Sequence, residues 1–110
     1  MAYELQQVTG NIVKFEADFI VNASNTKLIL GSGVSMAFKR HCGIELQHEM
    51  DEVRVKLKSI KQGDVVATSS GMASNFKYTL HAAVMNYAMG VNQKGKKPLL
   101  KTIELKFHCF

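Results

Sequence analysis

The feature that most constrains the fold is the segment Phe19–Cys42, where a short apolar run meets a polar, glycine-rich stretch. Phe19-Ile20-Val21 is apolar and rich in β-branched residues, which predicts a buried strand. The strand is expected to stop at the polar stretch Asn22–Thr26, and a glycine-rich turn follows at Gly31-Ser32-Gly33. Apolar positions at helical spacing then predict a helix over Val34–His41. In open α/β sheets, ligands bind beyond the carboxyl ends of strands, so this segment is the first candidate for a site.

The rest of the chain alternates between expected strands and helices. The expected elements are strands at Tyr3–Val8, Val65–Thr68 and Tyr78–Val84, helices at Ile44–Lys58 and from Pro98 onward, and a loop at Asn86–Lys97. The apolar positions at helical spacing are Leu46, Met50, Val53 and Leu57 in the first of these helices, and Leu99, Ile103 and Phe107 in the second. Strands with continuous apolar runs between helices indicate an α/β fold with a largely parallel sheet.

Length and composition indicate an ordinary globular chain. At 110 residues and 46% hydrophobic, residues 1–110 are expected to form a single domain. We expect no membrane association, because no apolar run approaches the roughly 18–20 residues of a membrane span. Two cysteines, Cys42 and Cys109, cannot form a disulfide framework, and no signal peptide precedes them, so we expect a cytoplasmic protein.

The remaining chemistry-bearing residues favour structural roles. His41, Cys42 and His48 have no fourth ligand at a suitable spacing, so we expect no metal and no cofactor. Cys42 has no evident base beside it in sequence, which favours a buried thiol over a nucleophile. His81 stands among apolar residues of a strand and is expected to be a core or strand-end histidine.

The positive charge of the chain is unevenly distributed. Residues 1–55 hold five basic and seven acidic side chains, whereas residues 56–110 hold nine basic and two acidic ones. Such asymmetry can attract nucleic acid. The lysines are spread over separate segments, however, and no Arg-aromatic interleaving accompanies them, so a solvated face is favoured and nucleic-acid binding is the less favoured alternative.

The Gly-rich turn has two interpretations. Backbone N–H groups of Gly31, Ser32 and Gly33, together with the helix N-terminus, could form a cradle for a phosphate group. The alternative is an ordinary turn before a helix. Asn22 and Asn25 could bind ribose hydroxyls through their amides, or could serve as turn and cap residues.

The order of these motifs resembles the signature of macro domains. Asp18 to Asn25, which ends in Asn-Ala-Ser-Asn, followed by Leu28, Gly31-Ser32-Gly33-Val34 and Ala37, is similar to that family's strand, Asn-rich loop and Gly-rich turn. Three flanking segments are similar as well: Val8–Ile12, Gly63–Thr68 and Tyr78–Ala83. The resemblance implies a three-layer α/β/α macro-domain-like fold with a mixed, largely parallel sheet.

The resemblance also implies a ligand and its contacts. The family binds ADP-ribose and its derivatives, so the implied partners are ADP-ribose or an ADP-ribosylated protein. Asn11 and the Ile12 backbone would contact adenine, Asn25 would hold the distal ribose, and Asn22 would support the loop. The phosphate cradle would be the backbone of Gly31, Ser32, Gly33 and Val34.

Whether the chain is an enzyme stays open. The family alternative is a hydrolase that removes ADP-ribose from proteins, or a phosphatase acting on ADP-ribose 1''-phosphate. Ser35 stands where many hydrolytic members carry an aspartate, which leaves Asn25 as the candidate catalytic residue. Asn11 likewise replaces a typical aspartate at the adenine contact.

The chain is short for this family. The resemblance implies a partial macro domain that lacks the last strands and a second Gly-rich loop. Because the missing strands would lie centrally in the sheet, unpaired strand edges are expected. We therefore expect a homo-oligomer that completes the sheet. The alternatives are that the retained strands pair directly with each other, or that the chain is a purely structural fragment.

Overall fold

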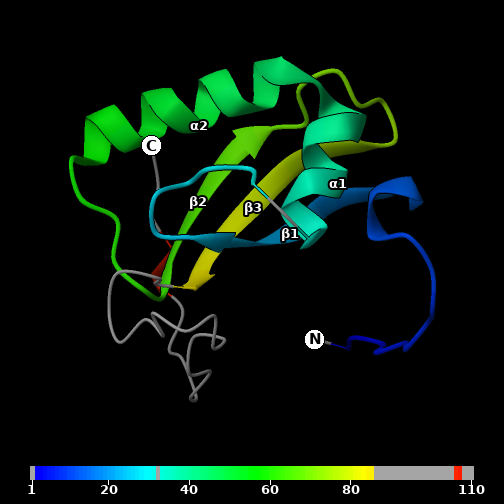
Figure 1. Cartoon of the computed structure of the whole chain (residues 1–110). Coiled ribbons are helices and arrows are strands. Elements are labelled where there is room, and N and C mark those ends of the chain that lie inside the picture. Colours follow the sequence, from blue (N-terminus) through cyan, green and yellow to red (C-terminus); the bar gives the residue numbers. More distant parts are fainter. Residues whose placement is uncertain (1, 32, 86–105, 108–110) are drawn as a thin grey trace, which may run out of the picture.

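The computed structural model describes residues 2–31, 33–85 and 106–107 (Figure 1). The elements in chain order are the 3-10 turn η1 (Ile12–Lys14), β1 (Ala17–Asn25), α1 (Gly33–Cys42), α2 (Ile44–Leu57), β2 (Asp64–Ser69), β3 (Phe76–Met85) and β4 (Lys106–Phe107). Within these residues, neither helix has the length and apolar character needed to cross a membrane.

The strands form one mixed sheet in the order β1-β3-β2-β4. β1 runs parallel to β3, with Phe19 opposite Tyr78, and β2 runs parallel to β4, with Val65 opposite Phe107. β2 and β3 are antiparallel neighbours that place Val66 opposite His81. The predicted α/β class with a mixed, largely parallel sheet is therefore confirmed.

Both described helices contribute to one hydrophobic core against the sheet. The buried side chains of this core include Ile20, Phe38, Leu46, Met50 and Val66. Phe38 of α1 meets Phe76 of β3 edge to face, with ring centroids 6.2 Å apart. The predicted apolar face of α2 is confirmed, since its members are either fully buried or packed against this core. Each such buried side chain stabilises the fold by roughly 1.5–3 kcal/mol.

β1 is longer than the sequence indicates, and its buried face is more polar. The strand was expected to stop before Asn22, but it continues to Asn25 and buries Asn22 and Ser24 on the same side as Ile20. Phe19 and Val21 face the other way and are 55% and 50% exposed. The expected stop was wrong because the inward polar side chains find hydrogen-bond partners, which removes the penalty for burying them.

Two of the expectations are wrong at described residues. Tyr3–Val8 is not a strand, and Tyr3 and Leu5 are about nine-tenths exposed. An extended segment becomes a strand only beside a backbone partner, and among the described residues none pairs with this segment. The last helix was expected to include Phe107, but Lys106–Phe107 form β4.

β4 forms because β2 offers an open edge. The Lys106 N–H donates to Gly63 O at 2.7 Å, and the pair Asp64–Lys106 extends the parallel register. A helical pattern with only a few apolar positions is overridden when an edge strand supplies unpaired backbone groups. The rest of that expected helix, and the expected loop Asn86–Lys97, lie outside the described residues.

The connection from β2 to β3 is anchored to the end of α1. The Met72 N–H donates to Cys42 O at 2.8 Å, and Gly71 has a φ of +60°. A Cβ atom at Gly71 would lie 2.4 Å from Cys42 O. Glycine is therefore required here by both backbone conformation and close approach.

We expect Gly71→Ala to lower the free energy of unfolding by about 2–4 kcal/mol, through a left-handed φ and a backbone clash. Gly31→Ala is the matched control, because a Cβ at Gly31 meets nothing within 4 Å. Its effect should stay within about 0.5 kcal/mol. Urea unfolding of both variants measures the difference, and equal losses would contradict the assigned role of Gly71.

Candidate functional site

The loop after β1 is shaped by the side chain of Asn25. Its Oδ1 accepts from the N–H groups of Lys27 and Ile29, at 3.0 and 3.2 Å, and its Nδ2 donates to Ile29 O at 3.0 Å. Leu28, at the centre of the turn, has a φ of +53°. A short amide that both donates and accepts can close such a turn, which is why asparagine suits this position.

A second amide ties the same loop to α2. Gln47 Nε2 donates to Leu28 O at 2.9 Å, and the Leu30 N–H donates to Gln47 Oε1 at 2.8 Å. Arg54 of the same helix donates to Lys27 O at 3.2 Å. Gln47 was not among the residues predicted from the sequence. A polar residue beside the apolar face of a helix is common, so the sequence pattern does not indicate that this one binds the loop.

A buried chain of hydrogen bonds joins α1 to three strands. Ser35 Oγ donates to Asn22 Oδ1 at 3.1 Å, and Asn22 Nδ2 lies 3.1 Å from His81 Nδ1. His81 Nε2 lies 2.9 Å from Thr68 Oγ1, which donates to Ser69 O. Because the Thr68 proton is used there, His81 Nε2 donates to Thr68 and Nδ1 accepts from Asn22.

The imidazole of His81 is neutral in this chain of bonds. Its side chain is fully buried, and burial lowers the pKa of His81 to about 4. Asn22 is fully buried as well and fixes the first turn of α1 through Ser35. The expectation of a core histidine is confirmed.

The start of α1 is open to a ligand. Gly33 has a φ of +59°, Val34 is 46% exposed, and the first turn holds no acidic side chain. Free N–H groups at a helix N-terminus carry partial positive charge, which favours an anion. Of the four cradle residues, Gly31, Gly33 and Val34 are described, and Ser32 lies outside the described residues.

The expected adenine contacts lie on η1, which packs against α1. Asn11 caps this turn, with its Oδ1 accepting from the Val13 N–H at 3.3 Å, and Ile12 is 39% exposed. A cavity of about 320 Å³ separates η1 from α1 and is lined in part by Asn11. Asn11 thus lies beside the later part of α1, where Ala37, Arg40 and His41 line the same cavity. The first turn of α1, at its other end, follows the loop after β1 (Figure 1).

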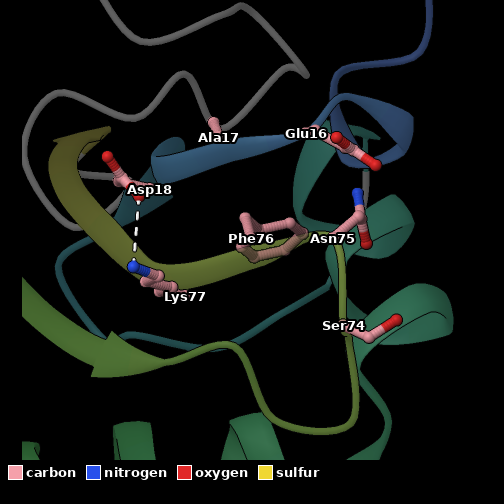
Figure 2. Close-up of a pocket in the computed structure, with 7 residues that line it drawn as sticks. All are labelled: Glu16, Ala17, Asp18, Ser74, Asn75, Phe76 and Lys77. Atoms are coloured by element: carbon pink, nitrogen blue, oxygen red, sulfur yellow. Dashed lines mark ion pairs between the residues drawn. The ribbon is translucent and has the colours of Figure 1, made fainter.

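A second cavity, of about 490 Å³, lies at the amino ends of β1 and β3 (Figure 2). Figure 2 shows Asp18 and Lys77 paired on one side of Phe76, with Asn75 and Ser74 on the other. The Asp18–Lys77 ion pair has an N–O distance of 3.5 Å and is largely exposed, so it contributes little to the stability of the fold. Its lining cation, Lys77, is paired with Asp18, and Glu16 adds a further negative charge, which makes this cavity the weaker candidate for an anionic ligand.

The described residues offer no alternative reactive centre. Among them, no three His, Cys, Asp or Glu side chains converge. Cys42 is fully buried, and burial raises the pKa of its thiol to about 11. A thiol in this state is not a nucleophile at neutral pH, so the expected buried helix thiol is confirmed.

A mixed α/β sheet, an Asn-rich strand end and a glycine-led helix start together define an open α/β fold, in which the carboxyl ends of the strands are the usual place for a ligand. The chain belongs to the macro domain family, whose model matches residues 21–105. It is 35% identical over 100 residues to an uncharacterized protein of Saccharolobus solfataricus, covering 91% of this chain and 56% of that protein. It is also 35% identical over 94 residues to a macro domain-containing protein of Listeria monocytogenes, covering 86% and 53%.

Solved macrodomains share the fold of the described core. The Oceanobacillus iheyensis macrodomain with MES bound superposes with a TM-score of 0.63 at 32% identity, covering 66% of this chain and 40% of that one. A mutant of the same macrodomain with ADPR gives the same values, and the macrodomain with ADP gives a TM-score of 0.62 at 30% identity. The chain spans about half the length of the curated relatives it matches.

We expect stability to fall on acidification because of His81. Its native pKa, about 4, lies below the ordinary value of 6.5, so between these values only the unfolded chain binds the proton. The free energy of unfolding therefore rises with pH in this window, and His81 accounts for a loss of about 3 kcal/mol from pH 7 to pH 4. Chemical unfolding at a series of pH values measures this slope.

The controls use variants that do not titrate. His81→Gln should flatten the slope between pH 4 and 6.5, whatever its effect on stability at pH 7. His48→Gln, at an exposed position of α2, should leave the slope unchanged. An unchanged slope in His81→Gln would show that the buried histidine does not cause the pH dependence of the free energy of unfolding.

Proposed function

We propose that this chain binds ADP-ribose or an ADP-ribose derivative, such as an ADP-ribosylated protein side chain. The observation that carries this proposal is the acid-free start of α1, which a fixed, glycine-containing loop leaves accessible. Solved macrodomains with ADPR and with ADP, at about 30% identity, support the same class of ligand.

The proposed contacts follow the order of the motifs. The backbone of Gly31, Ser32, Gly33 and Val34 holds the pyrophosphate at the N-terminus of α1. Asn11 and the Ile12 backbone contact the adenine, and Asn22 holds the first turn of α1 through Ser35. The phosphate group is the part of the ligand with the most favourable interaction energy, because it interacts with both the backbone N–H groups and the helix dipole.

Asn25 acts mainly through the loop in this proposal. Its oxygen accepts two backbone N–H groups, and one of its two amide hydrogens is donated to Ile29 O. One N–H remains for a hydroxyl of the distal ribose. Asn25 is thus first a positioning residue and only second a contact.

Binding is favoured over hydrolysis by the chemistry of the first turn. A hydrolase requires a positioned base or an activated water. Ser35 is only 4% exposed, its hydroxyl donates to Asn22, and no acid stands in the first turn of α1. We therefore propose a binding module rather than an ADP-ribosyl hydrolase or an ADP-ribose 1''-phosphate phosphatase.

We expect calorimetric titration with ADP-ribose to show micromolar binding by the unmutated chain. Val34→Glu should weaken it at least tenfold, because a carboxylate at the start of α1 repels the pyrophosphate while suiting the helix dipole. Val34→Gln is the matched control of equal size without charge, and should stay within about threefold of the unmutated chain. Absence of heat from the unmutated chain would reject the proposal.

A second pair of variants separates loop support from ligand contact. Gln47→Ala removes two hydrogen bonds that hold the loop but no proposed ligand contact. If the free Asn25 N–H binds the ribose, Asn25→Ala should weaken ADP-ribose binding about fivefold more than Gln47→Ala does. Equal weakening of binding in the two variants would show that Asn25 supports the loop and makes no contact with the ribose.

A further inference from the structure

The cavity between η1 and α1 is lined mainly by polar and basic side chains. It has a volume of about 320 Å³ and is lined by Asn11, Val13, Lys14, Ala37, Arg40 and His41. This volume is at the lower end of the range for small-molecule sites. None of the lining residues is acidic.

Asn11 presents a donor rather than an acceptor. Its Oδ1 is the atom that caps η1, because the Val13 N–H requires an oxygen. The amide nitrogen, which can only donate, is therefore the group that the cap leaves unused. An aspartate at this position would cap equally well but would add a negative charge to the cavity.

Asn75 fixes the wall on the α1 side. Its Nδ2 donates to Val13 O at 2.8 Å and to Phe15 O at 2.7 Å, which uses both of its hydrogens. Its Oδ1 must then accept from His41 Nε2, which lies 2.6 Å away. The His41 ring also stacks on Phe76, with centroids 6.0 Å apart. The turn and the helix are thus held at a set separation.

Lys14 and Arg40 supply two cations at this cavity. The ion pairs among the described residues are Arg54–Asp51 and Lys77–Asp18, so neither lining cation is neutralised by a carboxylate there. Two cations and an amide donor, without an acceptor of opposite charge, match the oxygens of a phosphate group.

We propose that this cavity binds a phosphate group on the ribose of the ligand's adenosine half, so that the chain prefers ADP-ribose 2'-phosphate to ADP-ribose. That the adenosine half lies here rests on the proposed function, in which Asn11 and Ile12 contact the adenine. The phosphate itself is recognised by Lys14, Arg40 and the Asn11 amide.

The test compares ADP-ribose with ADP-ribose 2'-phosphate by calorimetry on the full chain. The added phosphate should tighten binding about tenfold. Lys14→Ala and Arg40→Ala should each remove most of this gain, whereas Lys39→Ala, an exposed lysine of α1 outside the cavity, should keep it. Adenosine 2'-phosphate and inorganic phosphate, titrated alone, show whether the cavity takes phosphate without the rest of the ligand.

The outcomes separate the two proposals. Equal affinity for the two ADP-ribose ligands, or a gain that survives Arg40→Ala, overturns the phosphate cavity and leaves ADP-ribose binding standing. Binding of adenosine 2'-phosphate that depends on Arg40, without binding of ADP-ribose, supports the cavity and overturns the proposed function. Binding of none of the four probes overturns both. Arg40-dependent binding of inorganic phosphate supports the cavity and identifies free phosphate as a competing occupant.

Discussion

The start of α1 depends on a polar chain buried beneath it. Asn22 and His81 are fully buried, and each must find hydrogen-bond partners, since an unpaired buried polar group costs roughly 1–3 kcal/mol. Ser35 and Thr68 supply these partners from α1 and β2. In this chain of bonds the buried side chains are satisfied, and the first turn of α1 is fixed against the sheet. In the proposed function, this network sets the position of the phosphate at that turn, although the ligand does not touch it.

The loop before α1 is fixed by the same kind of chemistry in a more exposed setting. Asn25 accepts a hydrogen bond from the backbone of its own turn. Gln47 of α2 both donates to and accepts from the loop backbone, as a neighbouring strand would. Two side-chain amides thus replace regular secondary structure between β1 and α1. A loop held in advance loses less conformational freedom on binding, so more of the interaction energy remains as affinity.

The sequence predicts the local elements well and the contacts between them poorly. The apolar face of α2 was predictable because helical spacing alone determines which side chains share a face. The Gly31-Ser32-Gly33 turn located the start of α1, whereas the expected stop of the strand at Asn22 was wrong, because β1 runs four residues further. Gln47 and Asn75 could not be found, because their roles exist only once distant backbone groups meet them. Tyr3–Val8 and Phe107 were assigned wrongly for a related reason: the availability of an unpaired backbone decides whether a segment is a strand.

Local arrangement of charge matters more in this chain than its total. Residues 56–110 carry the excess of lysines, yet among the described members Lys61 lies in the connection before β2, whereas Lys77 lies on β3 and pairs with Asp18. The net-negative first half supplies Lys14 and Arg40, which line one cavity where no described residue contributes a carboxylate to the lining. Salt screens exposed charges beyond about 8–10 Å, so separated lysines add little to one another, whereas cations that share a cavity act on the same ligand group. The two cations of the proposed phosphate cavity therefore come from the half of the chain whose net charge is negative.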